Sequence, residues 1–389
     1  MIFESKFCEK FLFDAHAHLC YFHFRGITGG DLMEKNEFPV LLDHAGAWRV
    51  YLGGSRIRSL RGGSGAADDH YPEEWIASTV EASGAGAVPG AGLSRLRGEG
   101  APTLRELIAA APEAWLGRDF CRRHGHDCGV LLKLLDAAER LNVQVHPTRA
   151  DAKRLWGLPF GKAECWHFLE GRAGQSPSFY LGLREGVTEP VLRAAFDSGE
   201  PQRVLDCMHR FPAVPGQTVL VDGGVPHAIG AGCFLLEIQE PSDLTLRLEK
   251  RTASGTQVPD RLCHMGIGYD AMFSLIRYPG LSRSATRAAW FVPPRVLEDG
   301  PAGTVTQLLG YDRCPYFSLE RILAAADLAL DARPAFYGLF VLSGSGALLC
   351  GGREIPLAPG DQLFVPGGCP AVVLKPESPL CLIRFFGPW

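Results

Sequence analysis

The sequence predicts a mainly β fold in which one β-barrel unit occurs twice, with helices inserted into the first copy. Two observations lead to this prediction. Most regular segments are short, rich in β-branched and aromatic residues, and bounded by Gly, Pro or Asp, which is typical of sandwiches and barrels. In addition, residues 211–229 and 355–373 match each other without a gap, which indicates an internal repeat.

Composition limits the class of protein. The chain has 389 residues, of which 46% are hydrophobic and 21% charged, and its formal net charge is −4. This length favours two domains, and the mixture is typical of a folded soluble protein. The charge gives no reason to expect nucleic acid or an anionic membrane as a partner. We see no signal peptide and no run of about 18 apolar residues, so we expect a cytoplasmic protein.

The 12 cysteines have no C-x-x-C spacing, and we interpret them as small buried hydrophobic residues. Residues 1–32 are predicted to be an extension without a fold of its own, because "MEKNEFPVLLD" at Met33 reads like a natural start. Within the extension, a strand would place His16 and His18 on one face, as in an amidohydrolase metal site. The strand-helix alternation of such a metallohydrolase barrel does not follow, which disfavours this alternative.

Eight segments are predicted as strands because each is short, β-rich and ended by a turn residue. They are 48–54, 75–82, 142–147, 165–171, 179–183, 218–224, 233–239 and 244–250. Helical periodicity is less frequent. Residues 103–117 are predicted to form a helix, with Thr103 as N-cap and Glu106 completing a capping box. Three further segments fit a helix: 129–142 with one apolar face, 188–211 as two short helices broken at Gly199, and 318–330, which also fits a strand start.

The repeat explains the inserted helices. Both copies contain Pro-Gly, a short apolar strand and x-G-G-x-P. A second matching pair precedes them, "HFLEG" at 167–171 and "FVLSG" at 340–344, and its spacing to the repeat is longer in the first copy. The extra length corresponds to the helical stretch around 188–210, which we therefore interpret as an insertion into the first barrel.

The repeat also indicates where the chemistry lies. The first copy contains "DGGVPH", ending at His227, which resembles the second conserved motif of the cupin superfamily, where that histidine binds a metal. The second copy reads "PGGCPA" and has Ala371 at the position of His227. We therefore expect two cupin-type (jelly-roll) β-barrels with the site in the first. The predicted parts are an N-terminal extension at 1–32, a catalytic cupin domain with helical insertions at 33–250, a linker with helical character at 251–300, and a C-terminal cupin-like domain lacking metal ligands at 301–389.

Further candidate ligands lie before the repeat. Gln144 and His146 are two residues apart in "QVHP", so a strand would place both side chains on one face. Glu164 opens the strand "ECWHFLE", and His167 lies on its opposite face. Two histidines, a carboxylate and an amide suit a divalent ion such as Zn²⁺ with an open coordination position. A lone histidine on a strand is more often a hydrogen-bonded core residue, and the spacing alone does not decide between these readings.

Four motifs in this order resemble the class I mannose-6-phosphate isomerases (phosphomannose isomerases) in their short bacterial form: "QVHP", "GKAECW", "GGVPHAIGAG" and "LLEIQEPSDLTLRLE". "YPEEWIAST" at 71–79 resembles another segment of that family, and the similarity runs from about Phe38 to the C-terminus. The resemblance implies one zinc ion per chain. Its ligands would be Gln144, His146, Glu164 and His227, and Lys162 and Arg247 would serve catalysis and substrate binding.

The family interconverts mannose 6-phosphate and fructose 6-phosphate by moving a proton between C2 and C1 through a cis-enediol. Such a step needs a Lewis acid, a cation beside the developing negative charge and a proton shuttle. Arg247 is expected to stabilise the charge. Glu237, in "FLLEIQ", is a candidate shuttle, although it fits a solvent-facing carboxylate or a partner of Arg247 equally well. Lys162 fits proton transfer, phosphate binding or an exposed surface position.

Two alternatives to this isomerase remain. A non-catalytic sugar-phosphate-binding cupin, acting as a sensor or regulator, would share the fold, but the complete ligand set together with Arg247 speaks against it. A metal-dependent oxygenase would usually carry H-x-H where this chain has Gln144-Val145-His146. We expect a small sugar phosphate as ligand and a monomer or homodimer as assembly. "LEKR" at 248–251 stands where the bacterial enzymes often have "VYDY", so the substrate range stays open.

Overall fold

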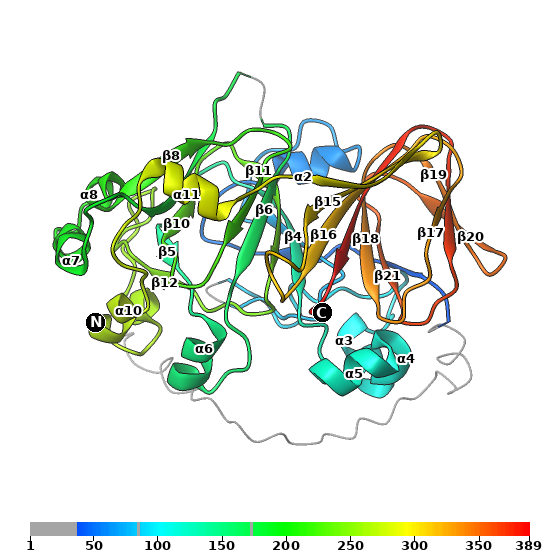
Figure 1. Cartoon of the computed structure of the whole chain (residues 1–389), viewed down its shortest axis with the longest axis horizontal. Coiled ribbons are helices and arrows are strands. Elements are labelled where there is room, and N and C mark those ends of the chain that lie inside the picture. Colours follow the sequence, from blue (N-terminus) through cyan, green and yellow to red (C-terminus); the bar gives the residue numbers. More distant parts are fainter. Residues whose placement is uncertain (1–36, 84–85, 172–173) are drawn as a thin grey trace, which may run out of the picture.

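Two β-barrels lie side by side along the long axis of the molecule (Figure 1). This computed structural model describes residues 37–83, 86–171 and 174–389. The predicted mainly β fold is confirmed, and each barrel is formed by a large and a small sheet, as expected for jelly rolls. The predicted extension at 1–32, including His16 and His18, lies outside the described residues.

The first barrel has a seven-stranded sheet in the order β13-β9-β6-β11-β4-β3-β2 and a five-stranded sheet in the order β12-β5-β10-β7-β8. The strands of the larger sheet are β2 (Gly46–Ala47), β3 (Glu73–Ile76), β4 (Leu131–Asp136), β6 (Glu164–Phe168), β9 (Thr218–Val221), β11 (Phe234–Gln239) and β13 (Phe291–Val292). Those of the smaller sheet are β5 (Gln144–Val145), β7 (Ser178–Leu183), β8 (Met208–Pro212), β10 (His227–Ile229) and β12 (Leu246–Arg247).

The second barrel has a seven-stranded sheet in the order β1-β21-β18-β23-β16-β15-β14 and a four-stranded sheet in the order β17-β22-β19-β20. The strands of the larger sheet are β1 (Val40–Leu42), β14 (Arg295–Gly300), β15 (Gly303–Leu309), β16 (Ser318–Ala324), β18 (Tyr337–Ser343), β21 (Gln362–Val365) and β23 (Leu380–Phe386). Those of the smaller sheet are β17 (Leu328–Leu330), β19 (Gly346–Cys350), β20 (Arg353–Leu357) and β22 (Val372–Pro376).

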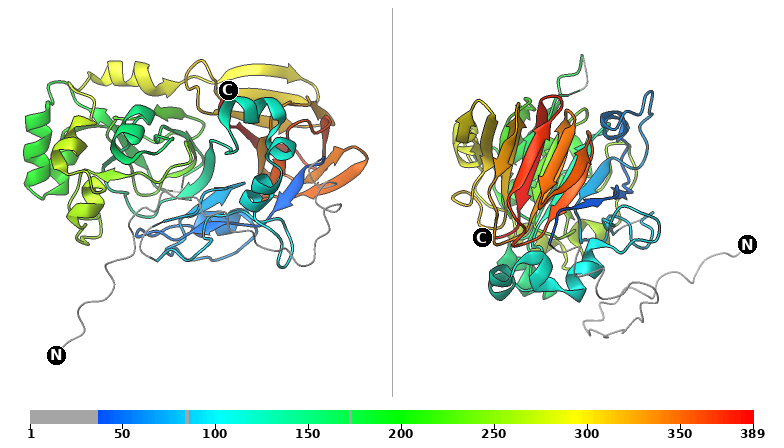
Figure 2. Two further views of the ribbon diagram at one scale, coloured as in Figure 1. Left: turned by 90° about the horizontal axis from the view of Figure 1, so that it is seen from below. Right: turned by 90° about the vertical axis from the view of Figure 1, so that its right-hand side faces the viewer.

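The helices lie outside the barrels, most of them around the first barrel (Figure 2). They are α2 (Ser55–Leu60), α3 (Leu104–Ala110), α4 (Pro112–Leu116), α5 (Arg118–His124), α6 (Arg149–Trp156), α7 (Glu189–Asp197), α8 (Pro201–Asp206), α9 (Asp260–His264), α10 (Tyr269–Ser274) and α11 (Arg283–Trp290). The helices α9, α10 and α11 and the strands β13 and β14 all fall in the predicted linker. Strand β1, from the other end of the chain, pairs with β21 of the second barrel. The predicted domain boundaries themselves stay a prediction.

The two large sheets are packed against each other by their outer faces. One hydrophobic cluster contains residues of both, among them Leu236 and Ile238 of β11 and Phe340 and Ile383 of β18 and β23. Because neighbouring residues of a strand face opposite sides of the sheet, Glu237 of β11 faces the interior of the first barrel. The packing between the barrels therefore holds β11 in place, and with it the polar residue Glu237 on the inner face of this strand.

The backbone supports the internal repeat. Gly216 and Gly224 of the first copy have φ angles of 82° and 82°, and Gly360 and Gly368 at the matching positions have 88° and 80°. Residues with a side chain rarely adopt these angles, so both turns require glycine. The two copies therefore share the conformation of their turns as well as their letters.

Several predicted elements agree with the structure and others do not. Thr103 caps α3 in a full capping box with Glu106, and the pair α7 and α8 is interrupted before Pro201. The helix predicted at 129–142 is wrong, because β4 occupies its centre. All six residues of β4 are buried, and a strand buried on both faces loses the alternation that distinguishes it from an apolar helix.

The structure decides one ambiguous segment and corrects one predicted strand. Residues 318–330 form strands β16 and β17, which decides the ambiguity in favour of a strand. Residues 48–54, predicted as a strand, form a loop with isolated bridges at Gly53. In this loop, Arg49 and Tyr51 both donate to the buried carboxylate of Glu73.

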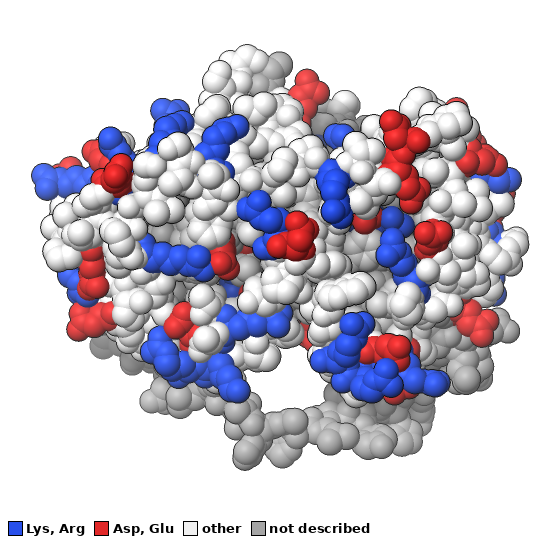
Figure 3. All heavy atoms as spheres, viewed as in Figure 1, with Lys and Arg blue, Asp and Glu red and all other residues white. Residues whose placement is uncertain are grey.

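The surface and the cysteines agree with the composition. Lys and Arg side chains gather near α5 and α6 at the lower edge in Figure 3, while the two signs of charge are mixed over the rest of this face. The described cysteines are all free, and all except Cys381 are buried. In the described part of the chain, none of the helices combines the length and apolar character of a membrane span.

Candidate metal centre and adjoining cavity

Strand register gathers the candidate residues of the five-stranded sheet on one face. Gln144 of β5 stands directly opposite His227 of β10 and, on its other side, opposite Arg247 of β12. Directly opposed residues of antiparallel strands share a face of the sheet. His146 follows Gln144 by two residues and turns to the same side. Glu164 comes from the facing sheet, where it opens β6.

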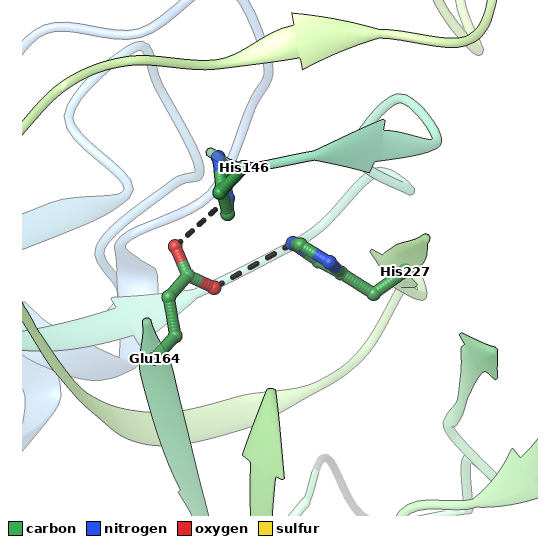
Figure 4. Close-up of side chains that lie close together, drawn as sticks. All are labelled: His146, Glu164 and His227. Atoms are coloured by element: carbon green, nitrogen blue, oxygen red, sulfur yellow. Dashed lines mark ion pairs between the residues drawn. The ribbon is translucent and has the colours of Figure 1, made fainter. Parts of the chain in front are cut away.

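His146, Glu164 and His227 point toward one another (Figure 4). Nε2 of His146 lies 3.0 Å from Oε1 of Glu164, and Nε2 of His227 lies 3.6 Å from Oε2 of the same carboxylate. All three side chains are buried. Within the described residues, no second group of three potential metal ligands of the types His, Cys, Asp and Glu comes together in this way.

Backbone carbonyls fix the protonation of both imidazoles. Nδ1 of His146 lies 2.8 Å from the carbonyl of Leu244, and Nδ1 of His227 lies 2.8 Å from the carbonyl of Val225. A carbonyl only accepts hydrogen bonds, so each Nδ1 carries the proton and each Nε2 offers a lone pair. Metal-binding histidines are oriented in this way.

The charges of the cluster favour neutral histidines beside an ionised carboxylate. Burial, and next the Lys162 ammonium, lower the pKa of His146 to about 3. Burial also lowers the pKa of His227. Burial alone would raise the pKa of Glu164, but Lys162 and His146 outweigh it and hold the pKa well below its usual range. Two lone pairs and a negative charge therefore face one another.

Such an arrangement is stable only with a cation among these atoms. Lys162 supplies one, because its Nζ lies 3.0 Å from Oε1 of Glu164 and 3.3 Å from Nε2 of His146. Among the described residues, no hydrogen bond of good geometry satisfies either oxygen of Glu164 or Nε2 of His227. Imidazole nitrogens and a carboxylate are the donors that divalent transition metals prefer, so the cluster fits a metal ion.

A cavity of about 340 Å³ adjoins the cluster, a volume in the range of small-molecule sites. Four of the predicted residues line it: Gln144, Lys162, Glu237 and Arg247. Lys162 belongs to both places, since it lines the cavity and contacts Glu164 and His146. A molecule in the cavity would therefore lie next to the metal cluster.

The chain was compared with family models, with curated proteins and with solved structures. No family model matches the chain, but the other two comparisons both find mannose-6-phosphate isomerases. The chain is 27% identical over 249 residues to the mannose-6-phosphate isomerase of Bacillus subtilis, covering 64% of this chain and 72% of that protein. It is 28% identical over 237 residues to the mannose-6-phosphate isomerase of Streptococcus mutans, covering 61% of this chain and 68% of that protein.

Solved structures extend the likeness to nearly the whole chain. The crystal structure of the mannose 6-phosphate isomerase from Bacillus subtilis aligns with a TM-score of 0.69 and 21% identity, covering 90% of this chain and 99% of that one. A phosphomannose isomerase from Salmonella typhimurium aligns with a TM-score of 0.66 and 16% identity, covering 90% and 100%. The chain resembles the mannose-6-phosphate isomerases in sequence and shares their fold.

The residues implied by the resemblance to mannose-6-phosphate isomerases lie together in space. The reading of Glu237 as a solvent-facing carboxylate or a partner of Arg247 is wrong. Glu237 is buried, and its carboxylate receives hydrogen bonds from Lys133 at 2.9 Å and from Trp166 at 3.1 Å. The reading of Lys162 as an exposed lysine is also wrong, because only 4% of the residue is exposed. His167 lies on the opposite face from Glu164, as predicted, and contacts Thr218.

The electrostatics of Glu237 differ from those of Glu164. Burial raises the pKa of Glu237, and the Glu164 carboxylate adds to this effect, while Lys133 acts against it. Burial alone would lower the pKa of Lys133, but the carboxylates of Glu237 and Glu73 outweigh it and raise the pKa. Arg247 has a different environment, since its guanidinium donates to the carbonyls of Leu262 and Thr245, at 2.8 and 3.2 Å.

Sequence reasoning missed several polar residues of the cavity. Lys133, Glu73, Arg49 and Asp243 all line it. Lys133 was hidden in a segment predicted as a helix, yet a single lysine within the apolar run "VLLKLLD" was a usable signal, because lysine is rarely buried without a partner. Arg49 lies in a loop, where no periodicity marks it.

Proposed function

We propose that this protein is a mannose-6-phosphate isomerase, which interconverts mannose 6-phosphate and fructose 6-phosphate and uses a zinc ion. The observation that carries the proposal is the convergence of two Nε2 lone pairs and the Glu164 carboxylate beside the cavity. The metal would be held by Gln144, His146, Glu164 and His227. Bound there, zinc would supply a Lewis acid for the oxygens of the substrate. The relatives named mannose-6-phosphate isomerase support this choice of reaction.

Glu237 is proposed as the residue that moves the proton. Its carboxylate takes the proton from C2 of the open-chain aldose, which leaves a cis-enediolate, and the same proton returns to C1 of the ketose. A proton also passes between O2 and O1, so the reaction is balanced without another reactant. Because burial raises the pKa of Glu237, its protonated form is more accessible than that of an ordinary carboxylate, which suits a group that both accepts and donates.

Lys162 and Arg247 are proposed as the cations that stabilise negative charge. Lys162 lies between the cluster and the cavity, so its ammonium is placed to stabilise charge that develops on the sugar oxygens. Arg247 also lines the cavity, where its guanidinium would bind either the enediolate or the phosphate. Gln144, beside both His227 and Arg247, would complete the set of metal ligands.

Turnover of mannose 6-phosphate by the purified zinc-loaded protein tests the proposal. We expect formation of fructose 6-phosphate in a coupled assay, and loss of activity in His146→Ala and in Glu164→Ala. Glu298→Ala is the control, because Glu298 is exposed on β14 of the other barrel, and it should retain activity. Activity that survives both site substitutions after removal of the metal would contradict the zinc mechanism.

The alternative, a sensor that binds a sugar phosphate without converting it, makes the opposite prediction. Such a protein would bind mannose 6-phosphate in calorimetry but show no turnover with zinc present. The assay with several sugar phosphates and with free mannose separates the two and also defines the substrate range.

A further inference from the structure

The loop that precedes β6 carries Lys162 of the site and leads directly into Glu164, the first residue of the strand, and it is held tightly. The backbone N–H of Lys162 donates to the carbonyl of Pro147 at 3.0 Å. A Cβ added at Gly161 would lie 2.7 Å from backbone atoms of Pro147, Thr148 and Arg149. The loop therefore lies directly on the start of α6, and its position depends on what fixes these few residues.

Glu240 holds this loop at Ala163, the residue between Lys162 and Glu164. Its carboxylate accepts a hydrogen bond from the Ala163 N–H at 3.1 Å, and its own N–H donates to the Ala163 carbonyl at 3.1 Å. Glu240 is 1% exposed and follows directly on β11. The two bonds join the end of β11 to the loop from both sides, so Ala163 has little freedom to shift.

Arg149 connects this contact to the second barrel. Its Nε lies 2.5 Å from the other carboxylate oxygen of Glu240, and its guanidinium lies 4.1 Å from the centre of the Tyr316 ring. Tyr316 precedes β16 of the second barrel, and a cation over an aromatic face is attracted to it. Contacts thus run without a gap from the second barrel through Arg149 and Glu240 to the loop of the site.

We propose that Glu240 is a positioning residue, which sets Lys162 and Glu164 in place for the metal and the substrate, and that Arg149 stacked on Tyr316 makes this placement depend on the second barrel. The inference rests on the proposed function. The inference gives the second barrel, which contributes none of the proposed metal ligands, a role in the site. The second barrel supports the site through Tyr316, whose side chain touches neither metal nor substrate.

The test compares Glu240→Ala and Glu240→Gln by zinc release and by turnover. In Glu240→Ala the Ala163 N–H loses its acceptor, so we expect zinc to be released to a chelator at least about tenfold faster and kcat to fall about 10- to 100-fold, the range expected for a displacement of about 1 Å. KM should stay close to that of the wild type, because Gln144 and Arg247 stand on other strands. Glu240→Gln keeps an acceptor for the Ala163 N–H, so its zinc release and its kcat should lie between those of the wild type and those of Glu240→Ala.

Variants of Tyr316 and a matched control complete the design. Tyr316→Phe keeps the ring face and should behave as wild type, while Tyr316→Ala should shift zinc release and kcat in the same direction as Glu240→Ala, by less. Glu320→Gln is the control, since Glu320 is likewise a buried carboxylate bound to an arginine, Arg384, at 2.8 Å but belongs to the second barrel. It should lower the melting temperature and leave zinc release unchanged.

Two results would overturn the inference. One is a rate of zinc release in Glu240→Ala equal to that of the wild type. The other is a change in zinc release and kcat in Glu240→Ala that is no greater than the change in a Glu320→Gln protein of equal melting temperature. If the wild type itself fails to convert mannose 6-phosphate, the proposed function is wrong, and zinc release alone still decides the role of Glu240.

Discussion

Single residues of the first barrel form a row of alternating charges beside the cavity. Arg49 contacts Glu73 at 3.0 Å, Glu73 lies 3.9 Å from Lys133, and Lys133 lies 2.9 Å from Glu237. Tyr51 and Trp75 also donate to Glu73. Each buried charge is thereby paired, so the row can remain inside the protein, and removing one member leaves its partners without compensation.

Glu73→Gln tests how much this row of charged residues contributes to the stability of the fold. Burial alone would raise the pKa of Glu73, but Arg49 and Lys133 outweigh it and lower the pKa to about 2 from 4.5. A carboxylate with a lowered pKa stabilises the fold above its unfolded pKa and loses this contribution as the pH falls through the folded value. The shift corresponds to about 3 kcal/mol. Glu73→Gln should therefore be less stable by this order of magnitude at pH values above about 4.5.

The difference in unfolding free energy between wild type and Glu73→Gln should then shrink as the pH falls from about 4.5 toward about 2. Urea unfolding followed at several pH values measures it. A difference that stays constant or grows over this range would show that the charge of Glu73 is not the cause.

The sequence indicated the ligand-type residues but not their surroundings. Gln144, His146, Glu164 and His227 were found because each stands in a short motif. Lys133 and Arg49 were missed because their importance comes from partners far along the chain, such as Glu237 and Glu73. The tautomers of the histidines also depend on carbonyls, those of Leu244 and Val225, which no side-chain pattern reveals.

Among the secondary-structure elements, those with local signals were predicted best. The capping box of α3 depends on two residues three positions apart, and the repeat turns depend on glycines. Strand β4 was mistaken for a helix because both of its faces are buried, one against the second barrel and the other in the interior of the first. Its identity is fixed by pairing with β3 and β11, which is a property of the tertiary structure.

Thr103→Ala tests the contribution of one helix cap. The Thr103 side chain accepts from the Glu106 N–H at 3.1 Å, and Glu106 accepts from the Thr103 N–H at 2.8 Å. Loss of the threonine oxygen should lower the unfolding free energy by about 1 kcal/mol, measured by urea denaturation.

Thr188→Ala is the matched control for this cap. Thr188 holds the same position before α7, yet among the described residues its side chain makes no capping hydrogen bond. Thr188→Ala should therefore lower the unfolding free energy much less than Thr103→Ala does. Equal costs for the two substitutions would mean that the capping hydrogen bonds are not the source of the effect.

For the molecule as a whole, the contact between the two large sheets decides whether the barrels unfold together. Phe340 is fully buried in the cluster shared by both barrels, and replacing it with alanine should cost about 3 to 5 kcal/mol. Because the cluster is continuous, we expect one unfolding transition in calorimetry, displaced as a whole in Phe340→Ala.

Leu323→Ala serves as the control for Phe340→Ala, because Leu323 lies in the same sheet but is 41% exposed. It should change the unfolding free energy by less than about 0.5 kcal/mol. Two separate transitions, of which Phe340→Ala displaces only one, would contradict the coupling of the barrels.

The position of β1 has a consequence for how the protein is made. Val40 pairs with Phe364, and Leu42 with Gln362, so β1 leaves the ribosome long before the strand with which it pairs. Until β21 has been synthesised, β1 has no partner, and the larger sheet of the second barrel is incomplete. This barrel can therefore close only after β21 has left the ribosome, and so distant a pairing is expected to form slowly.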